Sequence, residues 1–137
     1  MRIPRLVLMV LLVTACATLS FAQKLYQPKL TQQTSGVSEL LITVSPVDSK
    51  VVWAAGTHGT FLLTTDGGDT WTSGIVKGAE WLQFRGVRGV SATEAYLLSI
   101  GNKPTDFRIY KTEDAGATWT MQASNCAKSL RCATNPP

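Results

Sequence analysis

Short apolar stretches separated by turn-forming residues organise most of this chain. Each stretch spans four to six residues and is bounded by turn-forming residues such as glycine, serine, asparagine or proline, as is typical of antiparallel β-strands. No stretch after residue 22 shows the 3.6-residue period of an amphipathic helix, so the pattern predicts an all-β fold. The predicted strands are Leu40–Val44, Val51–Ala55, Phe61–Thr64, Trp71–Ile75, Leu82–Val87, Ala95–Ser99, Arg108–Thr112 and Trp119–Gln122.

An eight-residue motif occurs twice, with its two copies 48 residues apart. The copies are TTDGGDTW at 64–71 and TEDAGATW at 112–119, and they share five identical positions. Four-stranded propeller blades repeat every 40 to 50 residues or so. Because four predicted strands accompany each motif, the repeat predicts two consecutive four-stranded antiparallel blades.

The shared residues suit a tight turn between the third and fourth strand of each blade. An aspartate can accept hydrogen bonds from backbone N–H groups of its own loop, and a glycine adopts positive φ without a Cβ penalty. The threonine closes the loop, and the tryptophan opens the next strand with a large ring that we expect to pack between neighbouring sheets. These turn residues are Thr64, Asp66, Gly68 and Trp71 in the first copy, and Thr112, Asp114, Gly116 and Trp119 in the second.

The two motifs resemble Asp-boxes, the BNR repeats of sialidases and related propellers. The resemblance implies a partial β-propeller over residues 37–125, with two four-stranded antiparallel blades that each contain an Asp-box hairpin. It also implies that the box faces away from the ligand-binding axis. Two copies in register therefore support the fold and say little about activity.

Phrases around the motifs resemble the photosystem II stability/assembly factor group of BNR propellers. They are VWAAG at 52–56, GTFLLTTD at 59–66, FRGV at 84–87 and IYKT at 109–112. The resemblance implies a non-enzymatic protein that binds a protein partner through an arginine-rich surface. Arg85, Arg88 and Arg108 are the candidates for that surface, since arginine makes bidentate bonds and stacks on aromatic rings. Solvated arginines at strand and loop edges are the alternative interpretation.

Two blades are fewer than the four to eight or so of a closed propeller. We expect a truncated or frameshifted relative of a longer propeller, with an irregular tail over residues 126–137. The alternative is a homo-oligomer in which several copies complete a ring. In either case, open strand edges and an uncovered sheet face predict marginal stability.

The first 22 residues predict a secretory signal helix. Arg2 and Arg5 precede a short apolar run that is weaker than the roughly 20 residues of a membrane span. Small residues at Ser20 and Ala22 favour cleavage before Gln23, which gives a periplasmic or secreted protein without a membrane span. The alternative is a lipobox at 13–16, with a lipid anchor on Cys16.

The net charge and the cysteine content bear on the class of function and on the redox state of the chain. Removing residues 1–22 lowers the formal net charge from +4 to +2, and no basic run interleaved with aromatics remains, so nucleic-acid binding is not expected. Cys126 and Cys132 are the two cysteines of the mature chain; an oxidising compartment would allow a disulfide, and two free thiols are the alternative.

Catalytic and metal-binding motifs are not evident. The alternative function, a remnant of a sialidase-like glycoside hydrolase, would need an arginine triad, a tyrosine–glutamate pair and an acid/base aspartate, and the carboxylates form no such motif. The Arg-Ile-Pro sequence at 2–4, typical of sialidases, falls in the signal. His58 is the one histidine and is expected to be a loop residue, so we expect no metal, no cofactor and no enzyme activity.

The mass of the purified mature chain tests the export prediction. We expect the mass of a chain that begins at Gln23. A chain that begins at Cys16 and carries added lipid mass would instead establish the lipid anchor.

Overall fold

The computed structural model describes residues 28–124 and 133–134. The chain divides into two compact units, 1–32 and 33–137, and each is considered by itself. Residues 28–32 form no regular element, and every strand described below lies in the second unit. Within the described residues, no helix has the length and apolar character needed to span a membrane.

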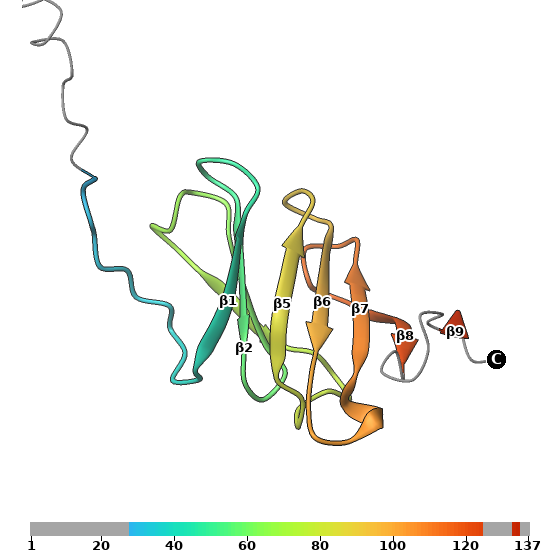
Figure 1. Cartoon of the computed structure of the whole chain (residues 1–137). Helices are drawn as coiled ribbons and strands as arrows, with labels where there is room; N and C mark the ends of the chain where they lie inside the picture. Colours follow the sequence, from blue (N-terminus) through green and yellow to red (C-terminus); the bar gives the residue numbers. More distant parts are fainter. Residues whose placement is uncertain (1–27, 125–132, 135–137) are drawn as a thin grey trace, which may run out of the picture. The chain divides into compact units, whose positions relative to one another are not determined.

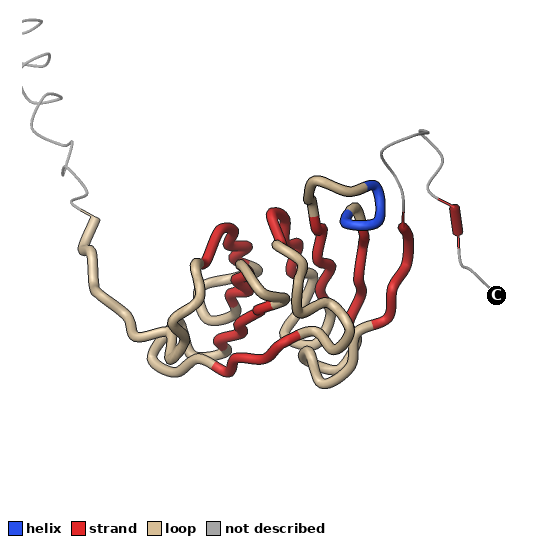
Figure 2. The backbone as a smooth tube through the Cα atoms, turned by 90° about the horizontal axis from the view of Figure 1, so that it is seen from below, coloured by secondary structure: helices blue, strands red, loops and turns tan. Residues whose placement is uncertain are grey.

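The second unit contains two antiparallel sheets whose strands follow one another in chain order (Figure 1; Figure 2). In each sheet, every strand pairs with the next through a short connection, which is the meander expected of a propeller blade. The first sheet comprises β1 (Leu41–Pro46), β2 (Val52–Gly56), β3 (Thr60–Thr64) and β4 (Thr72–Ile75). The second comprises β5 (Phe84–Gly89), β6 (Ala95–Ser99), β7 (Arg108–Thr112), β8 (Thr120–Ser124) and the short β9 (Ala133–Thr134), with a 3-10 turn, η1 (Pro104–Asp106), before β7.

The predicted all-β fold with two four-stranded antiparallel sheets is confirmed, and some strand bounds differ. β5 begins at Phe84 and not at Leu82, because the segment before it forms a turn in which the Leu82 N–H donates to the Ala79 carbonyl (2.9 Å). β4 and β8 begin one residue after Trp71 and Trp119, so each tryptophan closes its turn and does not open the strand.

β9 lies in the tail that the sequence predicted to be irregular. Its residues Ala133 and Thr134 pair antiparallel with Ser124 and Ala123 of β8. An edge strand offers unpaired N–H and C=O groups that another segment can use whatever its side chains are, so the pairing requires no alternating pattern. Cys126 and Cys132, like Cys16 and the signal sequence, lie outside the described residues.

The core lies between the two sheets, where β5 packs against β1 and β2 (Figure 1). Because successive strand residues point to opposite faces, one face of each sheet supplies this core. Two hydrogen bonds also join the sheets: the Trp53 Nε1–H donates to the Ser91 carbonyl (2.8 Å), and the Gly89 N–H donates to Ser45 Oγ (3.0 Å). The buried apolar residues of this cluster are Trp53, Ala55, Phe61, Leu63, Val76, Ala79, Leu82, Phe84, Ala95, Leu97 and Tyr110.

Three aromatic rings form the contact between the sheets. Trp119, which precedes β8, packs edge-on against Trp53 and Phe61 of the first sheet, with ring centroids 6.1 and 5.1 Å apart. Phe61 reaches this position because Gly116 has no side chain; a Cβ on Gly116 would overlap the Phe61 ring. The turn glycine therefore permits both the positive φ of its turn and the close approach of the neighbouring sheet.

A pair of alanine substitutions separates these two roles of Gly116. Gly78 also has a positive φ (77°, against 89° for Gly116), but a Cβ there meets nothing within 4 Å. We expect Gly78→Ala to cost about 1–2 kcal/mol of unfolding free energy through backbone strain alone. Gly116→Ala should cost measurably more, because Phe61 must also move. Urea unfolding measures both, and equal losses would contradict the contact between the sheets.

Candidate functional site

The two repeated turns are built by the same set of hydrogen bonds. In the first turn, the Thr70 N–H (3.0 Å) and the Thr64 hydroxyl (2.7 Å) donate to Asp66 Oδ1, and the Thr70 hydroxyl donates to Oδ2 (2.5 Å). The Gly68 N–H donates to the Thr64 hydroxyl oxygen (2.9 Å). The aspartate thus joins the two ends of its own turn.

The second turn repeats these contacts. The Thr118 N–H (2.8 Å) and the Thr112 hydroxyl (2.8 Å) donate to Asp114 Oδ1, and the Thr118 hydroxyl donates to Oδ2 (2.5 Å). The Gly116 N–H donates to the Thr112 hydroxyl oxygen (3.0 Å). The threonine before the tryptophan of each motif, Thr70 or Thr118, is identical in the two copies but was not among the turn residues predicted from the sequence.

These hydrogen bonds favour the ionised aspartates. The Thr70 hydroxyl, its backbone N–H and the Thr64 hydroxyl lower the pKa of Asp66 well below its usual range. Thr118 and Thr112 lower the pKa of Asp114 in the same way. Since each carboxylate is engaged within its own turn, the turns are structural elements.

The two turn tryptophans lie in different surroundings. Trp119 lies between the sheets, as described above. Trp71 lies on the opposite face of the first sheet, beside Leu62 and Leu41, and its Nε1–H donates to Gln33 Oε1 (3.3 Å). Trp71 therefore does not have the position between two sheets that we expected, because among the described residues no second sheet packs on that face.

A cavity of about 400 Å³ opens at the end of the second sheet away from its repeated turn. β7 begins there, after η1, and reaches the repeated turn at its other end (Figure 1). The cavity is lined by Trp81, Leu82, Gln83, Arg85, Ile100, Gly101, Asn102 and Asp106.

The turn before β5 places Trp81 at this cavity. Val76, Ala79 and Leu82 recur every third residue and are buried in the core. Backbone hydrogen bonds from Ala79 to Val76 and from Leu82 to Ala79 hold this spacing. Trp81, which falls between buried positions, is consequently directed outward and is 59% exposed.

Of the three predicted arginines, Arg108 contacts Trp81 and Arg85 lines the same cavity as Trp81. The Arg108 guanidinium lies over the Trp81 ring, 5.3 Å from its centroid, and donates to the Thr105 carbonyl (2.8 Å) and the Tyr110 hydroxyl (3.2 Å). Arg85 lines the cavity and donates to Gln83 Oε1 (3.2 Å). Among the described residues, neither arginine forms an ion pair, although the Asp106 side chain lines the same cavity as Arg85.

Arg88 lies elsewhere. It pairs in register with Tyr96 and borders a hollow on the outward face of the second sheet, with Leu98 and Ile109. The structure therefore separates Arg88 from the Trp81 cavity, although it is only three residues from Arg85.

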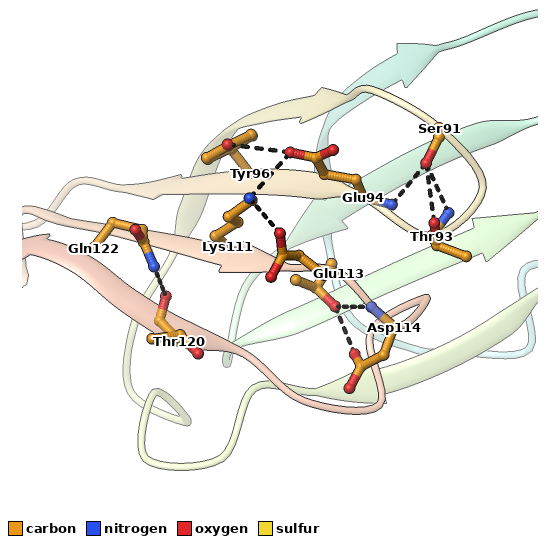
Figure 3. Close-up of polar contacts among 10 residues, drawn as sticks. Ser91, Thr93, Glu94, Tyr96, Lys111, Glu113, Asp114, Thr120 and Gln122 are labelled. Atoms are coloured by element: carbon orange, nitrogen blue, oxygen red, sulfur yellow. Dashed lines mark hydrogen bonds and ion pairs between the residues drawn. The ribbon is translucent and has the colours of Figure 1, made fainter.

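Lys111 is a basic residue that the sequence analysis did not single out (Figure 3). Its Nζ lies 2.6 Å from Glu113 and 3.2 Å from Glu94, and 5.7 Å from the centroid of the Tyr96 ring. These carboxylates, Glu113 first, raise the pKa of Lys111 far above its ordinary value. The positive charge of Lys111 is thus compensated by two carboxylates, whereas Arg85 and Arg108 form no ion pair among the described residues.

His58 takes part in a loop contact. Its Nδ1 lies 2.6 Å from Glu39 Oε2, to which the Thr57 hydroxyl also donates (2.8 Å). These contacts, that of His58 first, lower the pKa of Glu39. Within residues 28–124 and 133–134, no group of three His, Cys, Asp or Glu side chains is arranged to hold a metal ion.

Comparison with solved structures places the fold among the β-propellers. The chain superposes on YCF48 bound to D1 peptide with a TM-score of 0.52 and 21% sequence identity, over 70% of this chain and 29% of that one. YCF48 from Cyanidioschyzon merolae gives 21% identity over 68% of this chain and 43% of that one, with a TM-score of 0.36 that is too low to bear on the fold. No protein-family model and no curated protein matches the chain.

The class defined by these findings is thus a pair of blades of a β-propeller with a YCF48-like fold. The chain spans 29% of the length of YCF48 bound to D1 peptide. At this identity, the similarity shows the fold and transfers no residue roles.

The lowered pKa values of Asp66 and Asp114 predict sensitivity to acid. Their contribution to stability is complete above the unfolded carboxyl value near 3.8, declines as the pH falls below it, and is lost once the pH passes through the lower folded values. Urea unfolding from pH 7 to pH 2 should show this decline. The double variant Asp66→Asn and Asp114→Asn should be less stable at pH 7 and should lose less on acidification; an unchanged pH profile would contradict the assignment.

Proposed function

We propose that this chain is an exported, non-enzymatic module that binds a protein partner at the Trp81 cavity. The observation that carries the proposal is the exposed Trp81, which lies under the Arg108 guanidinium and lines one cavity with Arg85; among the described residues neither arginine forms an ion pair. Exposed tryptophan and arginine are the residue types that dominate binding energy at protein interfaces.

The chemistry of the cavity indicates what the partner presents. The Arg85 guanidinium, which has no ion-pair partner among the described residues, favours a carboxylate, which arginine can bind with two parallel hydrogen bonds. Ile100 and the Trp81 ring supply apolar surface in the same cavity. We therefore propose an extended segment in which an acidic residue lies next to an apolar one.

Two similarities support a binding role. The sequence phrases resemble photosystem II stability/assembly factors, a group that acts by binding proteins. The solved neighbour, YCF48, is bound to D1 peptide, so a propeller with this fold holds a peptide in that protein. By analogy, we propose peptide recognition for this chain, with no claim that the two sites use equivalent residues.

Export remains part of the proposal. The signal-like residues 1–22 support a periplasmic or secreted mature chain, and a lipid anchor on Cys16 is the alternative. A protein outside the cytoplasm meets extended segments of other exported proteins, which suits the proposed partner.

Binding of labelled model peptides tests the proposal. We expect the mature chain to bind a fluorescein-labelled peptide of alternating glutamate and leucine more tightly than one of alternating lysine and leucine. Arg85→Gln and Trp81→Ala should each weaken binding of the acidic peptide about tenfold, equivalent to about 1.4 kcal/mol, as measured by fluorescence anisotropy.

Arg88→Gln is the matched control. It removes the same charge from a different surface of the same strand, and we expect binding within twofold of the unsubstituted chain. An equal loss of affinity with Arg88→Gln would mean that net charge alone explains the weaker binding. Equal affinity for the acidic and the basic peptide would reject the site.

A further inference from the structure

Each sheet has one apolar face that the other sheet does not cover. On the first sheet this is the "leading face", formed by Leu41, Val44 and Trp71 over the buried Leu62; on the second sheet it is the "trailing face", formed by Tyr96, Leu98 and Ile109, with Lys111 beside them. Val44 is 64% exposed and Leu98 is 39% exposed. Apolar faces of this kind mark interaction sites.

The repeat shows what these faces correspond to. Moving 48 residues along the chain takes Trp71 to Trp119 and Leu62 to Tyr110, so the leading face is the equivalent of the buried face of the second sheet. The same shift takes Phe61 to Ile109, so the trailing face is the equivalent of the buried face of the first sheet.

Strand pairing shows the same equivalence between uncovered and buried positions for Val44 and Leu98. Val44 pairs with Ala54 as Val87 pairs with Leu97, and Val87 packs on the core between the sheets. In the next paired strand, Leu98 takes the place of the buried Ala55. The chain thus carries both halves of its own inter-sheet interface a second time, and among the described residues no further sheet packs on either of them.

We propose that a second copy of this chain docks head to tail, with the leading face of one copy on the trailing face of the next. Ile109 of one copy would lie against Trp71 of its neighbour, as Phe61 lies against Trp119 within the chain. Such an interface is heterologous, so each copy keeps one free face and the assembly can grow until it closes.

Gln33 supports this assignment of the docking position. A Cβ on Gly68 would overlap the Gln33 side chain, just as one on Gly116 would overlap Phe61. Gln33 Nε2 donates to the Gly67 carbonyl (3.1 Å), and Gln33 itself is exposed. Gln33 therefore occupies the place that an incoming apolar side chain would take, and docking displaces it.

The trailing face is suited to weaker binding than the internal interface. Tyr96 and Lys111 occupy the positions that Trp53 and Leu63 hold in the first sheet. The ion pairs of Lys111 with Glu94 and Glu113 compensate its charge, so docking does not leave a buried lysine unpaired. We therefore expect association that depends on concentration.

Analytical ultracentrifugation of the purified mature chain over a concentration series tests the proposal. We expect the mean mass to rise above that of one chain as concentration rises. Val44→Glu, on the leading face, and Leu98→Glu, on the trailing face, should each remain monomeric at the highest concentration. Circular dichroism establishes that both variants are folded, and Val44→Lys and Leu98→Lys replace any variant that is not.

Mixing the two variants is the decisive measurement. In a head-to-tail interface, Val44→Glu keeps a working trailing face and Leu98→Glu keeps a working leading face, so their mixture should form a one-to-one dimer and nothing larger. The control Lys77→Glu, at an exposed turn position on neither face and outside the Trp81 cavity, should associate like the unsubstituted chain.

Three outcomes would overturn the proposal. They are a chain that stays monomeric at every concentration, single variants that still associate, and a mixture that remains monomeric although both variants are folded. The test does not depend on peptide binding at the Trp81 cavity, so either proposal can fail alone.

Discussion

Contact between Phe61 of one sheet and the turn at Gly116 of the next is the interaction on which the rest of this structure depends. Neither sheet is large enough to bury a core by itself, so each relies on the other to cover its apolar face. The contact requires a residue without a side chain at Gly116 and a ring at Trp119 that can meet Phe61 and Trp53 edge-on. A local turn motif thereby also determines how two sheets pack.

This arrangement explains why the two ends of the sheets differ in chemistry. At the end with the repeated turns, Asp66 and Asp114 are held by their own threonines, and Lys111 is held by Glu94 and Glu113. At the opposite end, Arg85 and Arg108 have no such acidic partners among the described residues. Charges that stabilise the fold are thus satisfied internally, and the arginines proposed for recognition lie at the opposite end of the second sheet.

The packing of one sheet on the next is directional, because the two faces in contact are different. A blade that offers one kind of face to its successor and another to its predecessor forms an interface that is not symmetric, and repeats of this kind propagate along one axis. Proposals about partner binding and about self-association therefore concern different parts of the molecule: the loops at one end of the sheets, and the flat faces on either side.

The sequence by itself determined the strands, their grouping into two sheets and the turns between them, because these depend on short-range patterns and on a motif that occurs twice. It did not determine that Trp71 and Trp119 differ in surroundings, since the motifs are equivalent and only packing distinguishes them. It could not separate Arg88 from Arg85, because a strand bulge and side-chain direction decide which surface each reaches. Trp81, Lys111 and Gln33 also emerged only from the tertiary structure, where their partners come from distant parts of the chain.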